Sequence, residues 1–308
     1  MCEPDIVFDG LGDTKIQVKR RCGLEAKSRL VCSRALARAS PVLHVKLQEW
    51  LSSEKATSSR LHRLAIDLPA GDDDSLTLFL NIAHGRFLEI PRKLSISQLY
   101  NLTALTHCYQ STGLLDPWAD SWISLIESPA RGLNLAKLLW IFWELGKETA
   151  FTDMAHRMAM ELDATELQSV RQLWVSSKTT GVLDAVAGIR TEFLSFVTGI
   201  LRDMMEKLFV MDQSPRWSRY TAQPSLPRCR HVTYESIQSS LKAVNMWPLS
   251  EATAVRESAV EFYSKLAVVV HHGHRDCEFA NFWAGKVQQV LKSRPVVLTR
   301  LYRQFRCN

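Results

Sequence analysis

The chain has 308 residues, of which 46% are hydrophobic and 23% are charged, with a net charge of +6. These values are ordinary for a globular protein, so they exclude a chain disordered throughout, and no apolar run is long enough to span a membrane. Seven scattered cysteines and an acidic start without an apolar leader indicate a reducing compartment, so we expect an intracellular protein, cytoplasmic or nuclear.

The first elements are two short strands followed by a strand and two helices. The runs PDIVFDG (4–10) and KIQVKRR (15–21) are separated by glycines and are typical of a pair of strands. The segment RLVCSRALARASPV (29–42) then predicts a strand and a helix capped by Ser33. The pair Ser40-Pro41 ends that helix and begins the next, because proline is favoured in the first helical turn.

A further strand and two well-marked helices follow. HRLAIDLP (62–69) predicts a strand, and DDDSLTLFLNIAHG (72–85) predicts a helix with its aspartates at the positive N-terminal end. The clearest helix is predicted within 94–113, where Ser95 and Gln98 form a capping box and Gly113 is the expected stop. The histidine of HGRF is interpreted as a capping or packing residue.

Beyond residue 129 the strand patterns nearly vanish and helical periodicity dominates. Residues 212–231 have three prolines and no period, so we expect an exposed, proline-rich loop there. The helices expected on either side of this loop lie within 133–146, 151–162, 163–174, 182–208, 234–244, 250–270 and 278–291.

Four segments of the first third share the order and spacing of a known family. They are PDIVFDG, LVCSRALARASPV, LAIDLPAGDDDSLTLFLNIAHGRF and IPRKLSISQLYNLTALTHCYQSTGLLDPWADSWI. In this order, residues 5–126 resemble a BTB/POZ domain of the divergent kind found in many fungal proteins. The resemblance implies an α+β fold, with a short sheet flanked by helices in a BTB-like domain at 1–128 and an all-α helical region at 129–308.

The resemblance also implies a function without catalysis. BTB/POZ domains are protein–protein interaction modules of adaptors and scaffolds, and many form homodimers through their first strand and helices. Asp5 lies where family members often have an acidic residue near the dimer interface, and Arg34 or Arg38 would supply the opposite charge. A buried pair of this kind sets register more than it adds stability. The alternative is that these three are ordinary surface charges.

Two segments depart from the family pattern. GDTKIQVKRRCGLEAKSR (12–29) is longer than the usual connection, and QEWLSSEKATSSRLHR (48–63) lacks the hydrophobic-x-Glu signature of cullin-3 adaptors. Recruitment of a cullin-3 ubiquitin ligase is therefore left open. The helical region has no residue-by-residue match to a kelch, zinc-finger or ankyrin module.

One group of residues has metal-binding chemistry. Cys229 and His231 form one short-spaced pair, and His274 and Cys277 form another about forty residues later. Together the four could hold a structural zinc ion that fixes the proline-rich loop to the last helices. The spacing fits no standard zinc finger, so chance placement is the alternative, and we expect no other cofactor.

The remaining alternatives are a nucleic-acid-associated regulator and a metal-dependent enzyme. Residues 213–308 carry 14 basic and 6 acidic side chains, whereas residues 1–128 carry 15 of each. The basic last third could contact phosphates, although no recognition helix is apparent. Because the phosphate-binding, hydrolase and metalloprotease motifs are missing from the sequence, we predict a protein that is not an enzyme and binds other proteins, with no membrane partner.

Overall fold

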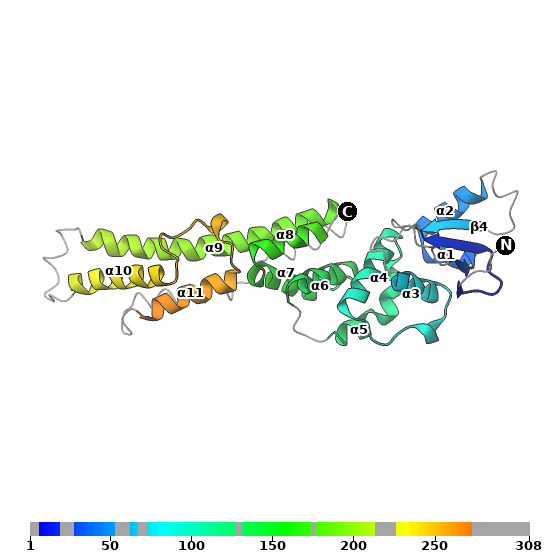
Figure 1. Cartoon of the computed structure of the whole chain (residues 1–308), viewed down its shortest axis with the longest axis horizontal. Helices are drawn as coiled ribbons and strands as arrows, with labels where there is room; N and C mark the ends of the chain where they lie inside the picture. The colour runs from blue at the N-terminus through cyan, green and yellow to red at the C-terminus, as the bar shows by residue number, and fades with distance from the viewer. Residues whose placement is uncertain are drawn as a thin grey trace. The chain divides into compact units, whose positions relative to one another are not determined.

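The computed structural model describes residues 6–18, 28–52, 62–66, 73–126, 131–173, 177–212 and 226–272. The chain is divided into two compact units, Met1–Ala150 and Phe151–Asn308 (Figure 1). Helices predominate and a small sheet lies in the first unit, which confirms the predicted α+β class. The division lies later than the boundary expected after residue 128, because helix α6 (Leu133–Glu144) packs against helix α4 (Ile96–Cys108) within the first unit.

The first unit begins with alternating strands and helices and continues with helices. Its described elements are β1 (Ile6–Val7), β2 (Thr14–Val18), β3 (Arg29–Val31), α1 (Ser33–Ala39), α2 (Pro41–Leu51), β4 (His62–Ile66), α3 (Asp73–Ala83), the 3-10 turn η2 (Phe87–Glu89), α4, the 3-10 turn η3 (Thr112–Leu115), α5 (Asp116–Ser124) and α6.

The four strands form one sheet in the order β1-β3-β2-β4. The predicted pairing of the first two strands is wrong, since β3 lies between them, parallel to β1 and antiparallel to β2. The turn after β1 explains this order. Gly12 lies so close to β3 that a Cβ atom there would be 2.8 Å from the Val31 carbonyl oxygen, and its N–H donates to the Asp9 carbonyl at 3.0 Å.

One face of the sheet is buried and carries an ion pair. Thr14 and Ile16 of β2 are fully buried and lie opposite Val31 and Arg29 of β3. The Arg29 side chain is also fully buried, and its Nη2 lies 2.6 Å from a carboxylate oxygen of Asp73, the first residue of α3. Because a buried guanidinium is costly without an acidic partner, this pair fixes the N-terminus of α3 against the sheet.

The joint between α1 and α2 is formed as predicted. Ser40 is the N-cap of α2, its Oγ accepts a hydrogen bond from the Leu43 N–H at 3.1 Å, and Pro41 follows in the first turn. The same hydroxyl donates to the carbonyl of Tyr109, the C-cap of α4, at 2.6 Å. Ser40 is fully buried, so one side chain satisfies two helix ends that are far apart in the sequence.

The helix ends elsewhere in this unit are partly as predicted. The capping box of Ser95 and Gln98 is present at the start of α4. The expected stop at Gly113 is wrong, because α4 ends at Cys108 and Gln110 takes a left-handed φ of 50°. Asparagine and glycine are more usual at such positions, so the residue type gave no indication of this end.

The regular elements in the described part of the second unit are all helical. It contains most of α7 (Glu148–Glu161), then α8 (Ala164–Leu173), α9 (Ser177–Asp212), α10 (Leu226–Ala243), the 3-10 turn η5 (Ala252–Ala254) and α11 (Ala259–His272). A capping box of Asp163 and Glu166 is present at the start of α8. The long helix predicted over 182–208 is confirmed within α9. Helices α9, α10 and α11 pack on one another (Figure 1).

Two expected boundaries in this unit are wrong. The loop predicted over 212–231 ends before α10, which begins at Leu226, because Pro227 falls in the first turn, where a missing N–H costs nothing. The helix predicted from residue 250 begins instead at Ala259, where the Ser258 hydroxyl accepts a hydrogen bond from the Glu261 N–H at 3.1 Å. The helix predicted over 278–291 lies outside the described residues.

Within this unit, Arg190 connects helix α9 to the segment between α10 and α11. Its Nη2 donates to the carbonyl oxygens of Val255 at 3.0 Å and Glu257 at 2.5 Å, while the Arg256 carbonyl between them accepts from the Ala164 N–H at 2.9 Å. Burial lowers the pKa of Arg190, and the charge of Asp163 acts in the opposite direction. Three successive carbonyls are therefore satisfied by α8 and α9.

We predict that Ser40→Ala destabilises the first unit by about 2–4 kcal/mol, because it removes both a helix cap and a buried hydrogen bond. Ser95→Ala is the matched control, since Ser95 is also an N-cap serine but is exposed; its expected cost is about 1 kcal/mol. Urea unfolding followed by tryptophan fluorescence measures both. Equal costs for the two variants would contradict the role given to the Tyr109 contact.

We also predict that Arg190→Met destabilises the second unit by about 2–4 kcal/mol, since the buried carbonyl of Val255 and the partly buried carbonyl of Glu257 lose a charged donor. Arg202→Met on the same helix removes an exposed pair with Glu251 at 3.2 Å and should cost less than about 1 kcal/mol. Hydrogen exchange of peptides covering residues 245–258 reports the effect locally. Unchanged exchange in the Arg190 variant would refute the prediction.

Candidate interaction surface

Large apolar side chains are exposed on two neighbouring segments of the first unit. Leu11 is 95% exposed in the turn after β1, and Leu88 is 101% exposed in η2. Single exposed apolar residues are common, whereas a contiguous group of them is typical of interaction sites, so these segments are the candidate. We call this group the β1–η2 surface, and it comprises Val7, Leu11, Phe87, Leu88 and the half-buried Trp118.

Arg86 joins the two segments of the β1–η2 surface. Its Nη1 donates to the Val7 carbonyl at 3.3 Å, and its guanidinium carbon lies 5.5 Å from the centre of the Phe8 ring. Gly85, with a φ of 71°, ends α3 just before Arg86 and turns the chain into η2. A side chain would be strained at this φ, so glycine at this position allows the sharp turn.

Aromatic stacking supports η2 from α5. The ring centres of Phe87 and Trp118 are 5.8 Å apart, and those of Trp118 and Trp122 are 6.1 Å apart. Trp122 is fully buried and donates its indole N–H to the Pro91 carbonyl at 2.9 Å. The surface is therefore held by contacts from β1 and from α5. These contacts reduce the conformational entropy that its side chains would lose when a partner binds.

A half-buried histidine, His84, lies next to this surface. The Nε2 atom of His84 accepts the Cys32 N–H at 3.0 Å, and Nδ1 lies 2.8 Å from the Leu80 carbonyl oxygen. The proton must therefore be on Nδ1 and the ring must be neutral, because a protonated Nε2 would oppose the Cys32 donor. Burial lowers the pKa of His84, aided by the charge of Arg86, while Leu80 and Asp9 act to raise it. This agrees with the packing role predicted for the histidine.

Asp13 provides the cap of α1 that was expected from Ser33. Its two carboxylate oxygens accept the Ser33 N–H at 2.7 Å and the Ser33 hydroxyl at 2.6 Å. Burial acts to raise the pKa of Asp13, but the hydrogen bonds from Ser33 and Thr14 outweigh it and the pKa lies below its usual value. A residue outside the helix thus satisfies its first turn, which no local pattern indicates.

The predicted interface residues are only partly described. Arg34 and Arg38 are exposed on α1, one helical turn apart. Asp5 lies outside the described residues, so its pairing with either arginine stays a prediction. Sequence reasoning missed Phe87 and Leu88, although two large apolar residues directly after a helix-ending glycine were the available signal.

A second cluster of polar groups holds helices of the first unit together. The Glu144 carboxylate lies 2.7 Å from Nδ1 of His107 and accepts the Thr112 hydroxyl at 3.0 Å, which attaches α6 to α4 and η3. The Trp140 ring lies 5.2 Å from the His107 ring. Desolvation and then the charge of Glu144 raise the pKa of the neighbouring Cys108 thiol, although the residue reaches the surface. A raised thiol pKa opposes nucleophilic chemistry.

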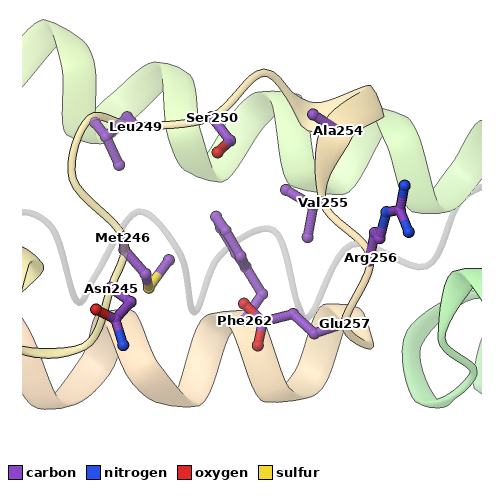
Figure 2. A pocket seen from close by; sticks show the side chains of 9 residues that line it. All are labelled: Asn245, Met246, Leu249, Ser250, Ala254, Val255, Arg256, Glu257 and Phe262. Atoms are coloured by element: carbon purple, nitrogen blue, oxygen red, sulfur yellow. The ribbon is translucent and has the colours of Figure 1, made fainter.

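The second unit has a pocket of about 320 Å³ beside the segment that Arg190 holds. Figure 2 shows the side chains of Met246, Val255 and Phe262 pointing toward its centre, whereas Arg256 points away from it. Glu257 also lines the pocket, but its carboxylate is paired with Lys265. The pocket is thus a hollow of mixed polar and apolar lining over the core of this unit, and among the described residues no unpaired carboxylate lines it.

The predicted zinc ligands are not brought together within the described residues. The backbones of Cys229 and His231 belong to α10, so this pair is helical and not part of the loop. The side chains of these two residues, and all of His274 and Cys277, lie outside what the structure describes, and zinc binding stays a prediction. In the described part of the chain, no three histidine, cysteine or acidic side chains are grouped as metal ligands would be.

Comparisons with known proteins add no assignment. A scan against protein-family models and a search of curated proteins return no match to this chain. Among the described helices, none combines the length and apolar character that crossing a bilayer requires.

We predict that His84 makes the first unit less stable in mild acid. The pKa of His84 is below its ordinary value of 6.5 in the folded state, so the unfolded chain binds the proton more readily. The contribution of His84 to stability is therefore complete above pH 6.5 and is lost as the pH falls below it. His84→Phe should be destabilised at pH 7 by about 1–3 kcal/mol, because the Cys32 N–H loses its acceptor, and should show a weaker pH dependence.

Urea unfolding at a series of pH values between neutrality and mild acid checks this prediction. His44→Gln, on the exposed face of α2, controls for the loss of a histidine as such. If wild type and His84→Phe lose stability in parallel on acidification, His84 does not act as described.

Proposed function

We propose that this chain is a non-enzymatic protein–protein interaction protein whose first unit is of BTB/POZ type and forms a homodimer. The order of elements supports the proposal: in the sequence segments that resemble the family, the strands of a small sheet are interleaved with helices, and further helices follow. The intracellular location, the adaptor role and the BTB/POZ assignment are parts of this proposal.

The observation that carries the proposal is the β1–η2 surface. Val7 is 47% exposed, Phe87 is 62% exposed, and Leu11 and Leu88 are almost wholly exposed. Burying such side chains against a partner yields about 25 cal/mol for each Å² of apolar area. A set of this kind on a rigid support is typical of the apolar centre of a protein interface.

A second copy of the chain is the partner that best fits the charges at this surface. Asp9 lies in the turn that carries Leu11, and Arg86 precedes Phe87. A two-fold dimer brings each patch against itself, so a patch with one acid and one base can pair each charge with its opposite. Asp5 with Arg34 or Arg38 would add a further pair of the same kind. The nucleic-acid alternative depends on the basic last third, most of which lies outside the described residues.

Light scattering of the full chain after size exclusion tests the proposal. We expect a mass twice the 35.0 kDa of one chain, and Leu88→Glu should raise the dissociation constant about tenfold or more, because two carboxylates would be buried in the dimer. Leu88 is fully exposed in the single chain, so this change leaves folding intact.

Val45→Glu is the matched control, since Val45 is 51% exposed on α2 and outside the β1–η2 surface. It should leave the dimer unchanged. A wild-type chain that remains monomeric at micromolar concentration, or equal weakening by both variants, would overturn self-association through this surface.

A further inference from the structure

An exposed serine follows two exposed basic residues in the segment that connects η2 to α4. Arg92, Lys93 and Ser95 all reach solvent, and the segment that carries them is neither helix nor strand. The backbone of Ser95 is extended, with φ of −71° and ψ of 159°. Within residues 91–95 only Leu94 is buried, at 3% exposed. The Ser95 hydroxyl and both basic side chains are therefore accessible to a second protein.

The spacing of these residues is that of a substrate of a basophilic protein kinase. Kinases of this class have an acidic substrate groove and select a hydroxyl residue with basic residues three and two positions earlier. Arg92 and Lys93 occupy these two positions before Ser95. In the whole sequence, the only other serine or threonine with an arginine three positions earlier is Thr233. Thr233 lies within α10, so its backbone is helical and not extended.

We propose that Ser95 is a phosphorylation site for a basophilic serine/threonine kinase. The kinase transfers the γ-phosphoryl group of ATP to the Ser95 hydroxyl. The bond between the γ-phosphorus and the oxygen that bridges it to the β-phosphorus breaks, and a bond from the γ-phosphorus to Ser95 Oγ forms. The hydroxyl proton passes to the catalytic aspartate of the kinase, and ADP leaves. This site does not depend on the β1–η2 surface or on dimer formation.

The surroundings of Ser95 suit the charge of the product. In the capping box, Ser95 Oγ accepts the Gln98 N–H at 3.2 Å and donates to Gln98 Oε1 at 2.9 Å. Phosphorylation removes the hydroxyl donor, but phosphate oxygens can still accept the first-turn N–H groups, which have no acceptor within the helix. Lys137 of α6 brings a positive charge to the same turn, where its Nζ donates to the Ser97 hydroxyl at 2.9 Å. Both features favour a phosphate at this end of α4.

Phosphorylation of the folded full chain tests the proposal. The probe is the catalytic subunit of cAMP-dependent protein kinase with Mg-ATP, and peptide mass spectrometry locates the phosphate. We expect phosphate on Ser95 and none at this segment in Ser95→Ala. Ser97→Ala is the matched control, because Ser97 is also exposed but has no arginine three positions earlier, and it should leave the reaction unchanged. Absence of phosphate on Ser95, or its appearance on Ser97 instead, would overturn the proposal.

A second pair of variants tests recognition by charge. Arg92→Ala should lower kcat/KM of the kinase for this chain about tenfold or more, because a charge-assisted contact in the substrate groove is lost. Arg131→Ala removes another exposed arginine outside this segment and should have no effect. Both arginines are exposed, so neither change puts folding at risk. Equal kcat/KM for the two variants would contradict recognition through Arg92.

Urea unfolding shows whether the phosphate still caps α4. The midpoint of the phosphorylated chain should lie above that of Ser95→Ala, because the phosphate oxygens accept first-turn N–H groups and alanine cannot. A midpoint at or below that of Ser95→Ala would contradict the capping role given to the phosphate. Dimer formation by light scattering is measured separately on the unmodified chain, so either proposal can fail alone.

Discussion

The hydrogen-bonding groups at the ends of buried helices are the constraint on which the first unit depends. Three hydrogen-bonded contacts of this kind lie within a few residues of the segment from β3 to α2, and each joins it to a residue distant in the sequence. Asp13 caps the start of α1, His84 accepts the Cys32 N–H, and Ser40 joins the start of α2 to the end of α4. Unpaired, each would cost about as much as a typical net hydrogen bond or more, so the three together fix the helices against the sheet.

This arrangement also determines what the surface can present. His84 is held at both ring nitrogens, and Arg86, two residues on, reaches back to β1. Phe87 and Leu88, which are exposed, therefore come directly after residues whose positions are fixed by contacts within the unit. A partner would meet preorganised side chains and pay little conformational entropy for ordering them. Asp13 and His84, both partly buried, are used in holding helix α1 in place.

Patterns confined to one stretch of sequence were sufficient for much of the fold. The cap at Ser40 and the capping box within 95–98 were predictable, because each depends on residues three positions apart. The position of β3 between β1 and β2 and the capping of α1 by Asp13 were not, because the partners come together only in the folded chain. The same holds for the site: the packing role of His84 was expected, but the exposure of Leu88 depends on which face of η2 the sheet and α5 leave uncovered.

Phe87 and Leu88 depart from the burial rule directly after the end of α3. Phe87 is 62% exposed, and Leu88 is a large apolar side chain entirely in solvent. The segment that carries them is held by the contact of Arg86 with β1 and by the ring contact between Phe87 and Trp118. Their exposure is therefore a consequence of contacts that fix the backbone on either side, and within that arrangement most of both side chains stays in water. An apolar surface on a second polypeptide would remove them from water, at about 25 cal/mol for each Å² of apolar area buried.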